Sequence, residues 1–408
     1  AGYLVRTAAT KGNTLQLTGD FNSTTPFEVI GAPKSAKKLT INGQPVAIET
    51  SRSTGSWNGL VRYQRPFFNI PTLENLQWKS TDALPEIQTS YDDSAWPSAD
   101  NKTSVNTYRN LTTPTSLYSS DYGFHYGYLI YRGHFVATGE ETTITIYTQG
   151  RNAYGTSAWL NGVDLGSNAG NATVGDSNST HTLGKLSKGK PYVLTMLMDN
   201  LGYDGNWVIG SDSMKNPNGI LHYEFAGRKQ SDITWKLTGN LGGEDYVDKT
   251  RGPLNEGGLF PERQGWHQQK PPTNSWKASK PTTGISKAGV VFYTAELNLN
   301  IPKGWDVPLS FTFKNTKQNE KFRAQLYVNG YQFGKYINNI GPQVDFSVPQ
   351  GILNYQGSNT VALTLWAQQP SGAKLEGLSL TAGTPVLTAL KNIELVPMPK
   401  YAKRAGAY

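Results

Sequence analysis

Apolar and polar residues alternate along most of this chain, in short segments that end in glycine, proline or asparagine. Alternation with a period of two predicts β-strands with one buried face, because successive side chains of a strand point to opposite sides. No long segment repeats its apolar residues with the 3.6-residue period of a helix. The pattern therefore predicts an all-β fold of antiparallel β-sandwiches or jelly rolls, in which two sheets bury alternate residues against each other.

Two long stretches of the chain share the same sequence anchors. A Trp-Lys pair occurs at residues 78–79 and again at residues 235–236, near the start of each stretch. A glycine then leads into a strand-like run with an anchoring tyrosine, at residues 127–135 in the first stretch and at residues 289–297 in the second. This shared order predicts two copies of one sandwich module.

An Asn-Gly turn comes next in each copy, at Asn161 and at Asn329. Asn-Gly between alternating apolar residues is a strong signal of a β-hairpin, because both turn residues take positive φ. A last strand begins 32 residues after the asparagine in both copies, at Val193 and at Val361. The equal spacing aligns the last strands of the two copies residue for residue.

The anchors divide the chain into three predicted domains. Residues 1–68 form a small β-sandwich, residues 69–236 a first jelly roll, and residues 237–408 a second jelly roll. Residues 69–76 carry a proline and link the small sandwich to the first copy. The small domain has strand-like segments at residues 14–18, 27–30 and 39–42.

The segment 238–275 is long, rich in glycine and proline, and without a regular period. A loop of this length is usually functional or packed against a neighbour. Its carboxylates allow one catalytic interpretation, because a retaining glycosidase needs two carboxyl groups roughly 5–5.5 Å apart. The alternative is that they cap turns and pair with nearby lysine and arginine side chains. The carboxylates are Glu244, Asp245, Asp248, Glu256 and Glu262, and the basic residues are Lys249, Arg251 and Arg263.

Charge and composition exclude several classes of function. The net charge is +8, but lysine and arginine are scattered, whereas a nucleic-acid site needs them gathered on one face. The chain has no cysteine, its five histidines lack the spacing of a metal pair, and no phosphate or dinucleotide motif occurs. No run of 18 apolar residues occurs. We therefore expect no metal, cofactor, nucleic acid or membrane as a partner.

Five Asn-x-Ser/Thr sequons stand in turn-like surroundings, and only 17% of the residues are charged. Both features predict a secreted, extracellular glycoprotein with N-linked glycans, although chance occurrence in a chain rich in serine, threonine and asparagine is the alternative. The first residues, Ala1-Gly2-Tyr3, already have a strand-like pattern, so we expect the chain to be a piece of a longer protein. The sequons are at Asn22, Asn101, Asn110, Asn171 and Asn178.

One loop is a candidate sugar-binding segment. Residues 199–210 leave the last strand of the first copy, are dense in glycine and asparagine, and carry Trp207 near their tip. Sugars present apolar C–H faces that stack on aromatic rings, so Trp207 is a candidate platform; a tryptophan folded back to plug the sandwich end is the alternative. The second copy has residues 368–372 there and no tryptophan, so we interpret it as scaffold.

Seven segments resemble the C-terminal part of the secreted fungal β-galactosidases of glycoside hydrolase family 35. They are residues 90–96, 116–124, 127–135, 237–246, 251–258, 304–308 and 404–408. Members of that family carry their two catalytic glutamates and the galactose subsite in an N-terminal (β/α)₈ barrel. The resemblance covers only a third domain and two jelly-roll, galactose-binding-like domains. A barrel takes about 250 residues of alternating strands and helices, and since no such pattern occurs here, no catalytic residue is carried over.

The resemblance implies a non-catalytic portion of a retaining β-galactosidase, an enzyme that hydrolyses terminal β-D-galactosyl residues of lactose and galacto-oligosaccharides. Its implied partner is the N-terminal barrel of the same enzyme, through which galactosides are bound, and Trp207 is implied to contact the sugar beyond the galactose subsite. Two other functions remain open. One is a free-standing carbohydrate-binding, lectin-like module, since jelly rolls often carry lectin sites. The other is a glycosidase that uses the linker carboxylates, which Glu244→Gln and Glu256→Gln would inactivate.

Overall fold

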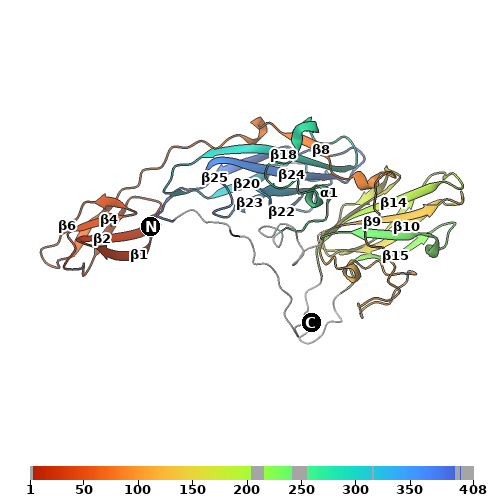
Figure 1. Ribbon diagram of the computed structural model, residues 1–408, viewed down its shortest axis with the longest axis horizontal. Helices are drawn as coiled ribbons and strands as arrows, with labels where there is room; N and C mark the ends of the chain where they lie inside the picture. Colours follow the sequence, from red (N-terminus) through yellow and green to blue (C-terminus); the bar gives the residue numbers. More distant parts are fainter. Residues whose placement is uncertain (1–2, 204–215, 241–254, 315–316, 391–395, 397–408) are drawn as a thin grey trace.

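The computed structural model describes residues 3–203, 216–240, 255–314, 317–390 and 396. Almost all regular structure in these residues is β-strand, and each helix has only three or four residues. None of these helices is long and apolar enough to cross a membrane. The strands form three sandwiches along an elongated molecule, with the second jelly roll between the N-terminal sandwich and the first jelly roll (Figure 1). The predicted all-β class is confirmed.

The N-terminal sandwich packs two sheets over a small apolar core. Its strands are β1 (Tyr3–Lys11), β2 (Thr14–Phe21), β3 (Thr25–Val29), β4 (Lys38–Ile41), β5 (Gln44–Val46), β6 (Glu49–Thr50) and β7 (Trp57–Val61). In one sheet β2 pairs with β1 and with β4, and in the other β7 pairs with β3 and β6. Leu15, Leu39 and Trp57 are buried between the sheets. All three segments predicted as strands in this part of the chain are strands.

The first jelly roll also has two layers. Its strands are β9 (Gly127–Val136), β10 (Thr143–Gln149), β11 (Gly155–Leu160), β12 (Val163–Asn168), β13 (Asp176–Thr182), β14 (Pro191–Asn200), β15 (Gly219–Phe225) and β16 (Thr234–Thr238). A large sheet in the order β12-β11-β14-β9-β16 covers a small sheet in the order β13-β10-β15. Leu129, Tyr131, Met196 and Phe225 are buried between the layers, as expected for strands that bury alternate residues.

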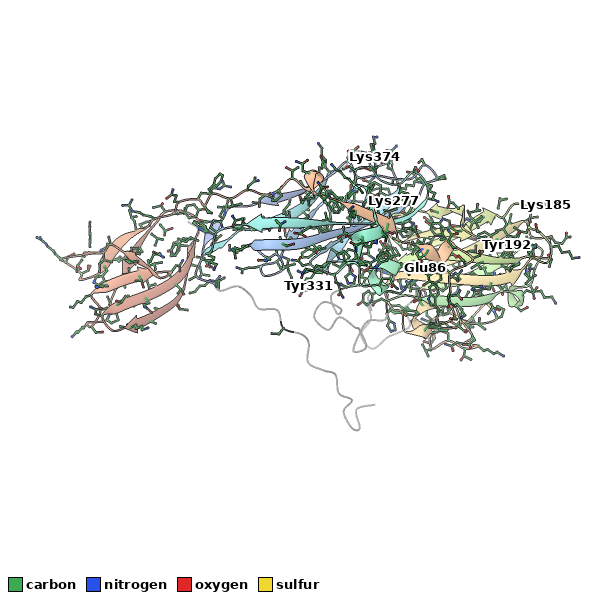
Figure 2. All side chains as sticks on the ribbon, turned by 45° about the horizontal axis from the view of Figure 1, so that its top comes forward. Glu86, Lys185, Tyr192, Lys277, Tyr331 and Lys374 are labelled. Atoms are coloured by element: carbon green, nitrogen blue, oxygen red, sulfur yellow. The ribbon has the colours of Figure 1, made fainter. Side chains whose placement is uncertain are left out.

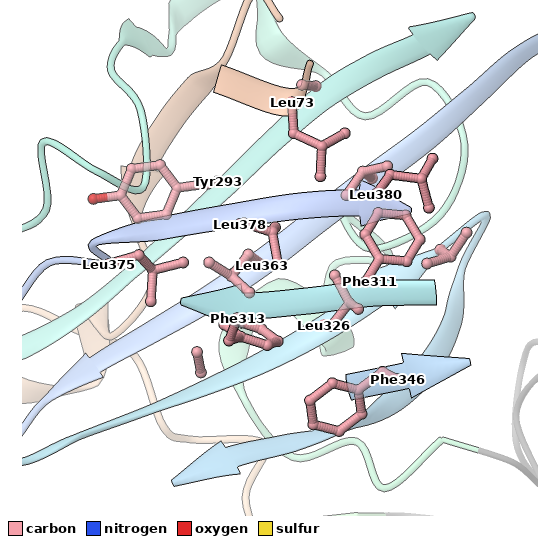
Figure 3. Packing of buried hydrophobic residues seen from close by; sticks show 14 of the residues in the cluster. Leu73, Tyr293, Phe311, Phe313, Leu326, Phe346, Leu363, Leu375, Leu378 and Leu380 are labelled. Atoms are coloured by element: carbon pink, nitrogen blue, oxygen red, sulfur yellow. The ribbon is translucent and has the colours of Figure 1, made fainter. Parts of the chain in front are cut away.

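The second jelly roll repeats this plan. Its strands are β8 (Lys79–Asp82), β17 (Lys277–Ala278), β18 (Gly289–Asn300), β20 (Leu309–Lys314), β21 (Phe322–Val328), β22 (Tyr331–Ile337), β23 (Asp345–Val348), β24 (Gln356–Ala367) and β25 (Gly377–Ala382). The large sheet has the order β17-β8-β18-β24-β21-β22 and the small sheet the order β23-β20-β25. Figure 3 shows Phe311, Leu326 and Leu363 in the core between them.

Short helical turns lie between some of the strands. They are η1 (Leu73–Asn75), η2 (Pro85–Ile87), η3 (Ser119–Tyr122), η4 (Gln230–Asp232), α1 (Phe260–Arg263) and η7 (Thr273–Ser275). The α1 turn lies within the segment predicted to be irregular, between the two jelly rolls in the chain.

The Asn-Gly turns have the predicted conformation. Asn161 and Asn329 both have φ of 49°, and the glycines that follow have φ of 81° and 85°. These left-handed values are what a type I′ hairpin turn requires. Each asparagine also holds the last strand of its copy, since the Asn161 Oδ1 accepts from the Val193 amide at 2.8 Å and the Asn329 Oδ1 from the Thr360 amide at 2.8 Å.

The first Trp-Lys pair belongs to the second jelly roll, so assigning residues 69–82 to the first jelly roll was wrong. β8 pairs with β18, and Trp78 lies in the core of the second jelly roll. Leu73 lies in the same core, as Figure 3 shows. The first jelly roll is thus inserted between β8 and the remaining strands of the second, which local sequence patterns do not reveal.

The second Trp-Lys pair completes the first jelly roll, since β16 pairs with β9 and ends two residues beyond the predicted boundary at 236. The two pairs are true counterparts. Two residues after each tryptophan, Ser80 lies opposite Tyr293 and Leu237 lies opposite Tyr131. The repeat is therefore real. In the sequence, however, the Trp-Lys strand of the second jelly roll precedes the whole first jelly roll, whereas the Trp-Lys strand of the first jelly roll is its last strand.

The last strands of the two copies are offset by one residue from the predicted alignment. Leu160 and Val328 each come directly before the Asn-Gly turn of their copy. Leu160 lies opposite Leu194, and Val328 lies opposite Val361. The counterpart of Val361 is therefore Leu194 and not Val193. A slip of one residue moves every side chain of a strand to the other face, and burial decides the register, because Leu194 and Val361 both lie in the core of their own sandwich.

After the second jelly roll the chain returns to the N-terminal sandwich. β26 (Val386–Leu387) pairs with β2, and β19 (Trp305–Asp306) pairs with β26. Tyr63 completes the joint, because its hydroxyl donates to the Pro385 carbonyl at 2.8 Å and its ring meets Trp305 edge-on at 5.3 Å. The small sandwich is thus held to the second jelly roll by strand pairing.

Candidate functional site

The two jelly rolls pack their large sheets against each other, and this interface gathers the buried charged groups that were candidates for chemistry. The apolar part is formed by side chains that point out of each sandwich core. The Trp366 indole Nε1 donates to the Ser157 Oγ at 2.9 Å across the interface. The larger apolar members are Tyr128, Ile130, Trp159 and Leu197 from the first jelly roll, and Val290, Phe292, Tyr327 and Trp366 from the second.

Asp199 is the centre of a buried ion-pair network across this interface. Its two oxygens meet the Arg323 Nη1 at 2.7 Å and the Lys335 Nζ at 2.5 Å, and the side chains of Asp199 and Arg323 are fully buried. Burial raises the pKa of Asp199, but Lys335 and Arg323 outweigh it and hold that pKa below its usual value. The Arg323 Nη2 also donates to the carbonyl oxygens of Ala153 and Ala169, at 2.7 and 3.0 Å.

Glu256 and Glu262, two of the linker carboxylates, lie in the same buried region. Glu256 forms an ion pair with Lys335. Among the described residues no cation lies within ion-pair distance of Glu262; its Oε1 accepts from the Tyr327 hydroxyl at 2.6 Å and from the Gln325 Nε2 at 3.2 Å. Burial raises the pKa of Glu262 to about 7, against the hydrogen bond from Tyr327.

This arrangement does not support glycoside hydrolysis by the linker carboxylates. A glycosidase needs its two carboxyl groups on either side of a bound sugar. Glu262 is only 6% exposed and its oxygens are occupied by protein donors, while Glu256 neutralises Lys335. Glu244, Asp245 and Asp248 lie outside the described residues. The described carboxylates instead join the linker to the second jelly roll.

A fourth buried carboxylate of the interface, Glu86, lies in η2. Glu86 forms an ion pair with Arg263 of α1, and Figure 2 shows Glu86 between the two jelly rolls. Burial raises the pKa of Glu86, although the Arg263 charge lowers it. The backbone carbonyl of Glu86 accepts from the Thr195 hydroxyl at 3.1 Å. The ion pair therefore fastens the segment before the first jelly roll to the segment after it.

Two histidines in strands of the first jelly roll are held by hydrogen-bond partners. The His134 Nε2 lies 2.7 Å from the Asp93 Oδ2, which also pairs with Arg132. The His222 Nδ1 lies 3.0 Å from the Thr112 Oγ1. Within the described ranges no three histidine, aspartate or glutamate side chains gather as metal ligands would.

The other predicted site residues are placed only in part. Trp207 lies outside the described residues, so its two interpretations stay open. All five sequon asparagines are exposed. Asn101 donates from its Nδ2 to the Asp121 carbonyl at 3.2 Å, and the Asn171 Oδ1 accepts from the Thr173 amide at 2.9 Å. Each of the five is therefore sterically open to a glycan.

Comparison with known proteins places this architecture in a family. A model described as the β-galactosidase second all-β domain matches residues 91–204 and 260–371, and a model described as β-galactosidase domain 3 matches residues 1–58. The chain belongs to the β-galactosidase family. The first model covers one stretch in each jelly roll, which agrees with the internal repeat.

Curated relatives locate the chain within the family's proteins. It is 58% identical over 408 residues to β-galactosidase A of Aspergillus niger, to β-galactosidase A of Aspergillus oryzae and to probable β-galactosidase A of Aspergillus fumigatus. In each case the match covers 100% of this chain and 40% of the relative. The chain therefore spans less than half the length of these relatives and corresponds to their C-terminal part. The resemblance inferred from the sequence segments is confirmed.

Solved structures add little to this assignment. A Bacteroides uniformis β-glucuronidase matches with 14% identity over 79% of this chain and 28% of its own, at a TM-score of 0.22. A glycoside hydrolase family 2 member from Bacteroides cellulosilyticus matches at a TM-score of 0.21 and 13% identity. Scores this low carry no argument about function.

Proposed function

We propose that this chain is the non-catalytic C-terminal β-sandwich portion of a retaining β-galactosidase, which supports the catalytic barrel of that enzyme and shapes the rim of its active site. The observation that carries the proposal is the 58% identity along the whole chain to the C-terminal part of β-galactosidase A relatives. The substrates are terminal β-D-galactosides such as lactose, and they reach this chain only through the barrel. The buried linker carboxylates support the absence of a catalytic pair in the described residues.

The isolated chain is expected to show no hydrolysis of a chromogenic β-galactoside. The reason is that hydrolysis needs two carboxyl groups flanking a bound sugar, and Glu256 and Glu262 are engaged in the interface. The assay compares the purified chain with full-length β-galactosidase A at equal molar concentration. Activity that co-elutes with the 408-residue chain through two purification steps would contradict the proposal.

Trp207 is proposed to reach over the barrel opening and to contact the sugar beyond the galactose subsite. The support is the composition of its loop and the absence of a tryptophan from the corresponding loop of the second copy. In the full-length enzyme such a residue acts on acceptor choice and not on bond cleavage.

We also propose that the protein is secreted and carries N-linked glycans, because all five sequon asparagines are exposed. Chain secreted from a fungal host is expected to lose mass on treatment with peptide N-glycosidase. Asn→Gln substitution at Asn22, Asn101, Asn110, Asn171 or Asn178 assigns the loss to a site. A mass equal to that of the bare polypeptide before treatment would overturn the proposal.

A further inference from the structure

The second jelly roll has a cavity of about 670 Å³ at the end where β18 stops and β24 begins. Its walls come mainly from residues 302–305 after β18 and from residues 350–356, which lead into β24. Tyr331, which Figure 2 labels on this jelly roll, also lines the cavity, together with Gln269, Asn329, Thr388 and Leu390. A volume of this order is typical of sites that bind small ligands, which run from roughly 300 to 1,000 Å³.

The cavity lies where the two copies of the module differ. β18 and β24 have 12 residues each, whereas their counterparts β9 and β14 have 10. At the corresponding end of the first copy, Glu141 accepts from the amides of Thr138 and Gly139, at 2.7 and 2.9 Å, and pairs with Arg228 at 2.7 Å. The first copy thus fastens its loop with a buried carboxylate, while the second copy extends both strands around a cavity. Loops that differ between copies of one scaffold are where separate functions arise.

Two buried asparagines hold the rim of the cavity in shape. The Asn329 Nδ2 donates to the Ile352 carbonyl at 2.7 Å and to the Asn359 Oδ1 at 2.8 Å. The Asn359 Nδ2 in turn donates to the Asn354 carbonyl at 2.9 Å. Asn329 and Asn359 are 5% and 1% exposed. A loop braced from below by buried amides is pre-organised, so little ordering entropy is lost when a ligand binds.

Two partly exposed aromatic rings line the cavity in fixed orientations. Trp305 is held edge-on against Tyr63 at 5.3 Å. The Tyr355 hydroxyl donates to the Val307 carbonyl at 2.8 Å, which sets the direction of its ring. Fixed aromatic rings suit the apolar C–H faces of sugar rings, which need a flat surface and lose little when held in place.

The polar part of the wall is made mostly of amides. Among the described residues that line the cavity, Lys303 carries the only charge, and no carboxylate is present. Carboxamides both donate and accept hydrogen bonds, as sugar hydroxyls do, whereas an anionic ligand such as a phosphate calls for several cations or a guanidinium fork. The side-chain amides are those of Gln269, Asn329, Gln350, Asn354 and Gln356.

We propose that this cavity is a binding site for a neutral oligosaccharide, in which Trp305 and Tyr355 stack on sugar rings and the amides of residues 350–356 bind hydroxyl groups. The site lies in the second jelly roll, whereas Trp207 belongs to the first, and it involves no hydrolysis. It therefore goes beyond the proposed function, and it gives the second copy a role besides that of a scaffold.

Calorimetric titration of the 408-residue chain tests the site. The probes are lactose and the tetrasaccharides of β-1,4-galactan, xylan and cellulose, with tetragalacturonate as the acidic comparison. At least one neutral probe is expected to bind at millimolar concentration or tighter, and tetragalacturonate is expected not to bind. If none of the neutral probes binds at a concentration of about 10 mM, the proposal is overturned.

Variants assign the binding to the cavity. Trp305→Ala is expected to weaken it about tenfold or more, equivalent to about 1.4 kcal/mol. Gln350→Ala, at an exposed position outside the sandwich core, is expected to weaken it measurably without affecting folding. Gln16→Ala, at an exposed glutamine of β2 in the N-terminal sandwich, is the matched control and is expected to leave the affinity unchanged. Unchanged affinity in both cavity variants, or loss of binding in Gln16→Ala, overturns the assignment. Hydrolysis is not measured here, so these outcomes are independent of the test of the proposed function.

Discussion

Asp199→Asn is expected to lower the free energy of unfolding by about 3–5 kcal/mol, the cost of breaking one buried ion pair and leaving its partner uncompensated. The substitution removes the negative charge that compensates the fully buried Arg323 and leaves a neutral amide oxygen in its place, beside the carbonyl oxygens of Ala153 and Ala169. Lys335 keeps Glu256 as its ion-pair partner, but Arg323 then has no carboxylate partner in the network. Urea unfolding followed by tryptophan fluorescence measures the change.

Glu320→Gln is the matched control, because it makes the same acid-to-amide change in an exposed pair. Glu320 lies 3.7 Å from Lys317, and their side chains are 28% and 56% exposed. Such surface pairs contribute about 0–1 kcal/mol. If Asp199→Asn changes the stability by no more than Glu320→Gln does, the network around Asp199 does not hold the two jelly rolls together.

The stability of the chain is expected to fall as the pH rises from about 4.5 to 7, and Glu262 is expected to account for about 3 kcal/mol of the change. Burial raises the pKa of Glu262 to about 7 in the folded chain, from an ordinary value of 4.5. The folded state therefore binds this proton more tightly than the unfolded state does. Its contribution is fully present below the unfolded pKa and is lost as the pH rises through the folded pKa.

Glu262→Gln tests this assignment, because the amide stays neutral and retains an oxygen that can accept from the Tyr327 hydroxyl. The variant is expected to lose less stability than the unsubstituted chain between pH 4.5 and 8, measured as the change in melting temperature. A smaller slope remains, because burial also raises the pKa of Glu86 and of Glu256. Parallel pH profiles for the two proteins would contradict the role given to Glu262.

Carboxyl groups whose pKa is lowered in the folded chain limit its stability at acid pH. Glu141 accepts from backbone amides and pairs with Arg228, and although desolvation raises its pKa, these partners lower that pKa to about 2. Its contribution is present above the unfolded value and is lost as the pH falls toward 2. Asp199 behaves in the same direction. The pH of greatest stability is therefore expected on the acid side of neutrality, between the two sets of groups.

The sequence predicted more of the local structure than of the candidate sites. The Asn-Gly turns at Asn161 and Asn329 were predictable because their positive φ is a property of the turn residues themselves. The cavity beside Trp305 was not predicted, since its walls come from segments more than 100 residues apart, from residue 269 to residue 390.

Amino-acid sequence by itself determined that this chain folds as β-sandwiches, that one module occurs twice, and that it resembles the C-terminal part of a β-galactosidase. These properties are local, since alternation, turn residues and family segments are read along the chain. Only the tertiary structure decided that the strand after Trp78 joins the second jelly roll, because the two copies have equivalent strands, β9 and β18, with which a Trp-Lys strand pairs. It also decided the one-residue offset that places Leu194 opposite Leu160. Both choices depend on which side chains are buried together, and burial is a property of the assembled sheets.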